Sequence, residues 1–427
     1  MLTIQKKLTN TFYILLSLPS TAMGFALSIQ IAALSWILNT KYNLNIHEIG
    51  IVWAAGPIAG IFGQVIVGMI SDKVWFWGGR RRPFILVGGT LAALMLVALP
   101  NIDKINSFLN FTSLIVIATI VALSLDLAIN ISFNPTRSII ADITPEGTPR
   151  TKGYTWMQTI SGTFAVLAYL IGALFGNYFL IYLGAIIVIL FSIVPMFMIS
   201  EPRELEIQAS EAEKTIVQNK TQWGQLFRLY FAHGFSWIGI QTMFVYIIIF
   251  IKQKMFGVSD FSAKLAPETD ESIGQIIAIS FLILNAIGAL LPAFVLEPVT
   301  EKLGRVKTHA LCVAVMALGY FGIVLFGKTP ISLYVLMAIL GVGWAAVVSL
   351  PFAIMSEKVD KNRMGFFMGI FNLSVVLPQL IVSLILGFFI ESFHDKNLIF
   401  LISAVTLTIS AVLWLLVREE KYRGENT

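Results

Sequence analysis

The polar stretch EPRELEIQASEAEKTIVQNKTQ, residues 201–222, divides the chain into two halves of similar length. It interrupts a sequence of 427 residues that is 57% hydrophobic and only 12% charged. Soluble proteins are about 25% charged, so this composition predicts a chain that crosses a membrane many times. The net charge of +5 does not indicate a nucleic-acid partner, and a single cysteine, Cys312, excludes an intrachain disulfide and a cysteine metal site.

Six apolar segments lie on each side of this stretch, and each has about the 20 residues that a spanning helix needs. We therefore predict an all-α polytopic membrane protein of twelve transmembrane helices. They form two pseudo-symmetric six-helix bundles, residues 1–200 and 226–427, joined by a cytoplasmic linker at 201–225. The predicted spans are 12–38, 48–71, 83–100, 108–141, 154–177, 179–199, 226–251, 272–298, 306–327, 331–356, 364–390 and 397–417.

Basic residues are distributed unequally between the two sides of these helices. The tails, the central linker and the loops after even-numbered spans hold 21 of the 29 Lys and Arg residues, and the loops after odd-numbered spans hold 7. Because positive loops stay in the cytoplasm, both termini are expected there. We expect a plasma-membrane protein, of the bacterial inner-membrane type, that works in the lipid bilayer as a monomer.

Loop motifs recur in register in the two halves. Gly68 to Lys73 followed by Gly79-Arg80-Arg81-Arg82 is answered by Glu297 to Gly304-Arg305, and Pro135 to Asp142 is answered by Pro351 to Glu357. A glycine permits close helix approach, and carboxylates at helix ends can pair with arginines to close a gate. The alternative is a basic loop that serves orientation only. The predicted gating residues are Gly68, Asp72, Arg80, Arg81, Arg82, Asp142 and Glu297.

One carboxylate, Asp126, lies in the middle of the fourth predicted span, where an ionisable group costs roughly 3 kcal/mol. Helical periodicity places it on one stripe with Asn130, Phe133, Asn134 and Arg137. A carboxylate in a low-dielectric cavity can hold a proton near neutral pH, and amides and guanidinium groups can bind the hydroxyl groups of a substrate. We therefore predict Asp126 for proton coupling, and Asn130, Arg137, Gln30, Gln158, Trp53 and Phe133 for substrate binding, with no cofactor and no metal.

Two structural alternatives exist for these charges. An ion pair between Asp126 and Arg137 is unfavourable because about 16 Å separates them along the helix axis. Arg137 could instead pair with Asp142 near the cytoplasmic end of the span.

The position equivalent to Asp126 in the second half is Val342, so proton chemistry is expected in the first half only.

Four motifs, in order, resemble the sucrose-transporter branch of the glycoside–pentoside–hexuronide symporters, within the major facilitator superfamily. They are the second-span run Gly50 to Gly60, the loop Gly79-Arg-Arg-Arg-Pro-Phe-Ile85, the fourth-span pattern Asp126, Asn130, Pro135, Arg137 and Asp142, and the eleventh-span run Gly369 to Gln379. The resemblance implies proton-coupled disaccharide uptake, with Asp126 as the proton acceptor and Arg137 close to the sugar. Ile129 departs from the plant proteins, which usually carry a second asparagine there, and this leaves the substrate open.

The sequence therefore predicts a symporter that carries a proton with a sucrose- or maltose-type sugar by alternating access, and not an enzyme. Sodium-coupled or uncoupled glycoside transport is the alternative within the transporter class. A membrane sensor built on a transporter scaffold and an amphiphile exporter are the alternatives from other classes.

Overall fold

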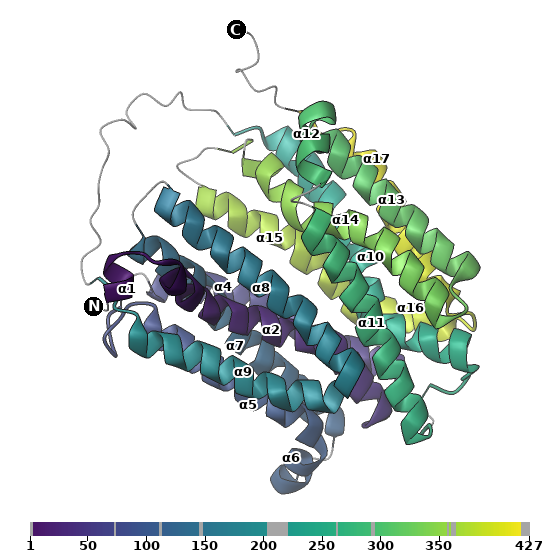
Figure 1. Cartoon of the computed structure of the whole chain (residues 1–427). Coiled ribbons are helices and arrows are strands. Elements are labelled where there is room, and N and C mark those ends of the chain that lie inside the picture. Colours follow the sequence, from purple (N-terminus) through teal and green to yellow (C-terminus); the bar gives the residue numbers. More distant parts are fainter. Residues whose placement is uncertain are drawn as a thin grey trace. The chain divides into compact units, whose positions relative to one another are not determined.

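The computed structural model describes residues 3–71, 74–110, 113–144, 148–202, 221–261, 264–291, 295–356, 358–359 and 364–419. These residues are almost entirely helical, and eleven of their helices are long and apolar enough to cross a membrane. The all-α, multi-span architecture predicted from composition is therefore confirmed. Figure 1 labels the main elements along the chain.

The chain divides into two compact units, Met1–Gln208 with Asp260–Ile279, and Ala209–Ser259 with Ser280–Thr427. The boundaries between the units lie in the predicted linker, most of which is outside the described residues, between α10 and α11, and inside α11. The first-half helices are α1 Thr3–Lys6, α2 Asn10–Thr40, α3 Ile46–Trp53, α4 Ala55–Ser71, α5 Arg82–Ala98, the 3₁₀ turn η1 Leu99–Asn101, α6 Ile102–Leu109, α7 Leu114–Ile143, α8 Thr148–Phe175 and α9 Asn177–Met198. The second-half helices are α10 Trp223–Phe256, α11 Pro267–Leu291, α12 Glu297–Leu303, α13 Arg305–Phe326, α14 Pro330–Ser356, α15 Met364–Ile381, the π-helical turn η5 Val382–Leu386, α16 Gly387–Ser392 and α17 Asn397–Trp414.

The second predicted span is broken into two helices, α3 and α4, which meet at Ala54. Asn45 begins α3 with a reciprocal capping box to Glu48. Pro57 explains the break, because it has no N–H to donate to the carbonyl of Trp53 one turn earlier. The break places the first turn of α4 beside the central part of α7.

The fourth span begins later than predicted, at Leu114 rather than at residue 108. Residues 102–109 instead form the separate short helix α6, which ends at Asn110 in the left-handed conformation. Asparagine tolerates this conformation better than most residues do, and the hydrophobic pattern alone does not show it. From there α7 continues without interruption through Pro135, so the predicted polar stripe lies on one helix.

Glycines set the position of α7 in the first unit. A Cβ on Gly88 of α5 would lie 2.2 Å from Ser132 Oγ and 2.7 Å from the Ala128 carbonyl oxygen, both on α7. A Cβ on Gly89 would lie 2.2 Å from the side chain of Ser192 on α9. Small residues let membrane helices approach closely, and so α5 packs between α7 and α9. In the second unit, α13 lies against α14 and α17, and α17 also packs on α10.

The N-terminal half of α11, up to Ile279, belongs to the first unit, although it comes from the second half of the sequence. Three side chains hold this segment by donating hydrogen bonds to main-chain carbonyls, and we call this set the outer clasp. Its bonds run from Trp36 Nε1 to the Asp270 oxygen at 2.7 Å, from Asn39 Nδ2 to the Phe261 oxygen at 3.1 Å, and from Gln275 Nε2 to the Ala173 oxygen at 2.9 Å.

Candidate functional site

Asp126 lies in α7 and is 7% exposed. Gln30 of α2 is itself buried, and its Nε2 donates to Asp126 Oδ2 at 2.9 Å. A Cβ on Gly56, in the first turn of α4, would lie only 3.1 Å and 3.2 Å from the two carboxylate oxygens. Helices α2, α4 and α7 therefore surround this carboxylate. It accepts a hydrogen bond from the neutral amide of Gln30 and lies close to the backbone of Gly56, which has no side chain.

Asn130 is also buried, and its Nδ2 donates to the backbone carbonyl of Asp126 at 2.8 Å. About two helical turns further on, the guanidinium of the exposed Arg137 lies 5.1 Å from the centre of the Phe133 ring. Such a cation–π contact orients the guanidinium while leaving its N–H groups able to donate. The stripe predicted from helical periodicity thus has a protected carboxylate at one end and an exposed cation at the other.

Two further candidates differ in their surroundings. Trp53 is buried at the end of α3, and its Nε1 donates to Ser35 Oγ at 2.8 Å. Gln158 is exposed on α8, and no described hydrogen bond joins it to Asp126. Substrate binding by either residue stays a prediction.

The basic loop before α5 surrounds a carboxylate that the sequence analysis did not single out. Glu201 accepts hydrogen bonds from the backbone N–H groups of Arg80 and Arg81, each at 2.8 Å, and from that of Arg82 at 2.7 Å. A Cβ on Gly79 would lie 2.3 Å from Glu201 Oε1, so any side chain at this position would push the Glu201 carboxylate away from these N–H groups. A carboxylate here satisfies N–H groups that have no partner within the helix and complements the helix dipole.

The Arg81 side chain links this loop to α7. Its Nε donates to Asp142 Oδ2 at 2.9 Å, and its Nη1 donates to Ser71 Oγ at 2.7 Å. The pair is well shielded, with 7% and 11% of the two side chains exposed. Asp142 therefore pairs with Arg81 rather than with Arg137, which corrects the alternative weighed from the sequence.

The second unit repeats the same arrangement. Glu419, just after α17, accepts from the backbone N–H groups of Arg305 at 2.9 Å and Val306 at 2.7 Å, at the start of α13. Gly304 precedes them with a φ of 84°, and a Cβ there would lie 2.9 Å from Glu419. The signal available in the sequence was a glutamate directly after the sixth and the twelfth predicted span.

The remaining predicted gating residues are less well described. Asp72 lies outside the described residues, and the surroundings of Gly68 in α4 and of the Glu297 side chain in α12 are not described. Val342, at the position equivalent to Asp126, packs against an apolar cluster that includes Leu296 and Ala346. The two repeats therefore share their loop architecture but differ in the middle of the membrane.

A family model described as Major Facilitator Superfamily matches residues 16–383 and 282–427. The chain belongs to this superfamily. Among solved structures, this chain resembles a D-xylose-proton symporter with a TM-score of 0.71 and 16% identity, over 96% of this chain and 99% of the other. It also resembles the nucleoside transporter NupG with a TM-score of 0.67 and 13% identity, over 97% of this chain and all of the other (100%). At these identities the likeness shows the fold.

Relatives of this chain are named as transporters. It is 24% identical to the sucrose transport protein SUC4 of Arabidopsis thaliana over 450 residues, which cover 90% of this chain and 85% of the relative. It is 31% identical to the general alpha-glucoside permease of Schizosaccharomyces pombe over 176 residues, or 37% of this chain and 32% of the relative. The relatives and the fold neighbours are transporters, so the prediction that the chain is not an enzyme is confirmed.

Proposed function

We propose that this protein is a proton-coupled sugar symporter that takes up a sucrose- or maltose-type disaccharide by alternating access. The names of its sucrose and alpha-glucoside transporting relatives support the substrate class. The burial of Asp126 in a spanning helix supports the proton as the coupling ion. Its hydrogen-bond donor is a neutral amide, and the ion pairs of the described residues do not include it.

In this mechanism Asp126 receives a proton from the outer side while the sugar binds against Asn130 and the exposed guanidinium of Arg137. A protonated Asp126 needs no counter-ion in the membrane, so the loaded carrier can change conformation at low cost. Release of the proton and the sugar on the inner side restores the carboxylate, which Gln30 stabilises by its 2.9 Å hydrogen bond.

The test is sugar accumulation by the purified protein in proteoliposomes under an imposed pH gradient. Asp126→Asn should abolish accumulation of labelled sucrose or maltose but retain exchange of the sugar across the membrane, because binding and rocking do not need the proton. Asp260→Asn, the same change at an exposed acid, is the control and should behave like the wild type. If Asp126→Asn still concentrates sugar against its gradient, the proton role is wrong.

Replacing sodium with choline separates the alternatives, since a sodium-coupled carrier stops under this condition and a proton-coupled one does not. An amphiphile exporter or a sensor would show no counterflow of labelled sugar. We further propose, from the distribution of Lys and Arg, that both termini are cytoplasmic in a bacterial inner membrane, and that the monomer is the working form.

A further inference from the structure

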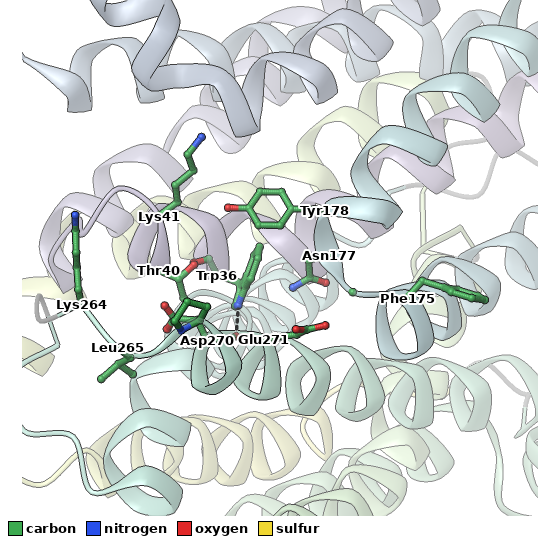
Figure 2. Close-up of a pocket in the computed structure, with 13 residues that line it drawn as sticks. Trp36, Thr40, Lys41, Phe175, Asn177, Tyr178, Lys264, Leu265, Asp270 and Glu271 are labelled. Atoms are coloured by element: carbon green, nitrogen blue, oxygen red, sulfur yellow. Dashed lines mark hydrogen bonds between the residues drawn. The ribbon is translucent and has the colours of Figure 1, made fainter.

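A cavity of about 470 Å³ lies in the first unit beside the outer clasp. It opens where α2 ends and where α9 and α11 begin, which is the side that the distribution of basic residues assigns to the outside. Its size is in the range of small-molecule sites. Figure 2 shows its lining residues, among them Trp36, Thr40, Lys41, Asn177, Tyr178, Lys264, Asp270 and Glu271.

The lining combines aromatic surface with balanced charge. The rings of Trp36 and Tyr178 meet edge to face, with their centres 5.2 Å apart. Two lysines, Lys41 and Lys264, are matched by two acids, Asp270 and Glu271. In this first cavity, aromatic walls and two charges of each sign favour a neutral ligand with many hydroxyl groups over an anion or a cation.

Asn177 supplies an unusual polar group. It is 3% exposed, and neither its Nδ2 nor its Oδ1 has a hydrogen-bond partner among the described residues. Gly172 and Gly274 leave room for this amide, since a Cβ on Gly274 would lie 2.8 Å from Nδ2 and one on Gly172 would lie 3.3 Å from Oδ1. A buried amide without partners is costly, so a ligand that supplies a donor and an acceptor would be stabilised there.

A second cavity of about 250 Å³ adjoins the first, and both are lined by Gly176 and Glu271. Its other polar lining residues are Glu268, Ser272 and Gln275. Two adjoining spaces that share one exposed carboxylate suit a ligand of two linked rings. Thr40 lies ten residues beyond Gln30 on α2, or about 15 Å along the helix axis, so these cavities are separate from the surroundings of Asp126.

We propose that these cavities form an outer sugar-binding site, in which Asn177 and Glu271 bind the hydroxyls of a disaccharide before it reaches the Asp126 site. This inference rests on the proposed function for its class of ligand. The site would capture substrate at low concentration without taking part in coupling.

The experiment is equilibrium binding of radiolabelled sucrose and, separately, maltose to the purified full-length protein, together with initial rates of uptake. The wild type should bind two sugars per chain. Asn177→Leu and, independently, Glu271→Gln should weaken one of them about tenfold and raise the KM for uptake several-fold, while Vmax stays unchanged. Because Glu271 is exposed, Glu271→Gln is expected to fold even if Asn177→Leu does not.

Matched controls are Asn101→Ala and Lys328→Ala, which change a polar and a charged residue in other outer loops. The combined change Asn130→Ala and Arg137→Ala should remove the inner site and leave the outer one occupied. A single sugar per chain in a transporting wild type, or an unchanged KM in Glu271→Gln, overturns the outer site and leaves the proposed function intact. A wild type that neither binds nor transports sugar overturns both.

Discussion

Removing the carboxylate of Glu419 should destabilise the second unit by loosening the start of α13. Of its two hydrogen bonds, the one from Val306 is half-buried and the one from Arg305 is exposed. A hydrogen bond to a charged group contributes about 1.5–3 kcal/mol when shielded from water, and less when exposed. With that discount, Glu419→Ala should lower the free energy of unfolding by about 2 kcal/mol, which for a unit of this size is about 4–8 °C in Tm.

The chain carries its own reporter for this measurement. Cys312 is the only cysteine in the sequence, it is buried, and it lies in α13 about two turns after Arg305, where Glu419 binds the start of the helix. Heating the purified protein with a thiol-reactive dye therefore follows the unfolding of this helix. Glu419→Gln keeps one acceptor oxygen and should fall between the wild type and Glu419→Ala. Glu391→Ala, at an exposed acid in the same unit, should leave the transition unchanged.

Equal transition temperatures for Glu419→Ala and the wild type would refute the reasoning. So would an equal loss in Glu391→Ala, because the effect would then come from net charge and not from capping. Glu201 provides a comparison within the same chain. It accepts three such bonds and not two, so Glu201→Ala should destabilise the first unit more than Glu419→Ala destabilises the second.

Three further outcomes are expected. Gly56→Ala should reduce gradient-driven uptake at least tenfold while the protein still folds, because the new Cβ would lie too close to the carboxylate of Asp126. Normal uptake by this variant would show that the contact is unimportant. Asp142→Asn, which leaves the shielded Arg81 guanidinium without its counter-charge, should cost about 3 kcal/mol of stability, measured as a fall in Tm. Burial raises the pKa of Asp395, but the hydrogen bonds from Lys254 and Asn397 and the charge of Lys254 together outweigh this and lower the pKa below its ordinary value. Its small stabilisation should therefore be complete above about pH 4 and lost at lower pH, and thermal scans of Asp395→Asn should lack this loss.

The spanning helices could be predicted because hydrophobicity over about 20 residues is a strong local signal. The break at Ala54 was missed because it interrupts no apolar run, and only the missing N–H of Pro57 causes it. Likewise, Asn110 ends α6 through its backbone conformation, inside a segment that hydropathy alone joins to the next span.

The site was predicted as far as helical periodicity extends. Asp126, Asn130 and Arg137 lie on one helix, as their spacing indicated. Glu201 was missed because its partners are about 120 residues away in the sequence, and a carboxylate that binds backbone N–H groups leaves no paired residue type to recognise. The pairing of Asp142 with Arg81, 61 residues upstream, needed the helix arrangement for the same reason.

The outer clasp has a consequence for how sequences of this kind can diverge. All three of its acceptors are main-chain carbonyls, at Asp270, Phe261 and Ala173. Every amino acid supplies the same carbonyl, so substitutions at these positions leave the bonds intact, whereas each donor side chain is hard to replace. A one-residue deletion between α10 and α11, in contrast, would shift the carbonyls of Phe261 and Asp270 relative to their donors, so length in this loop should be more constrained than composition.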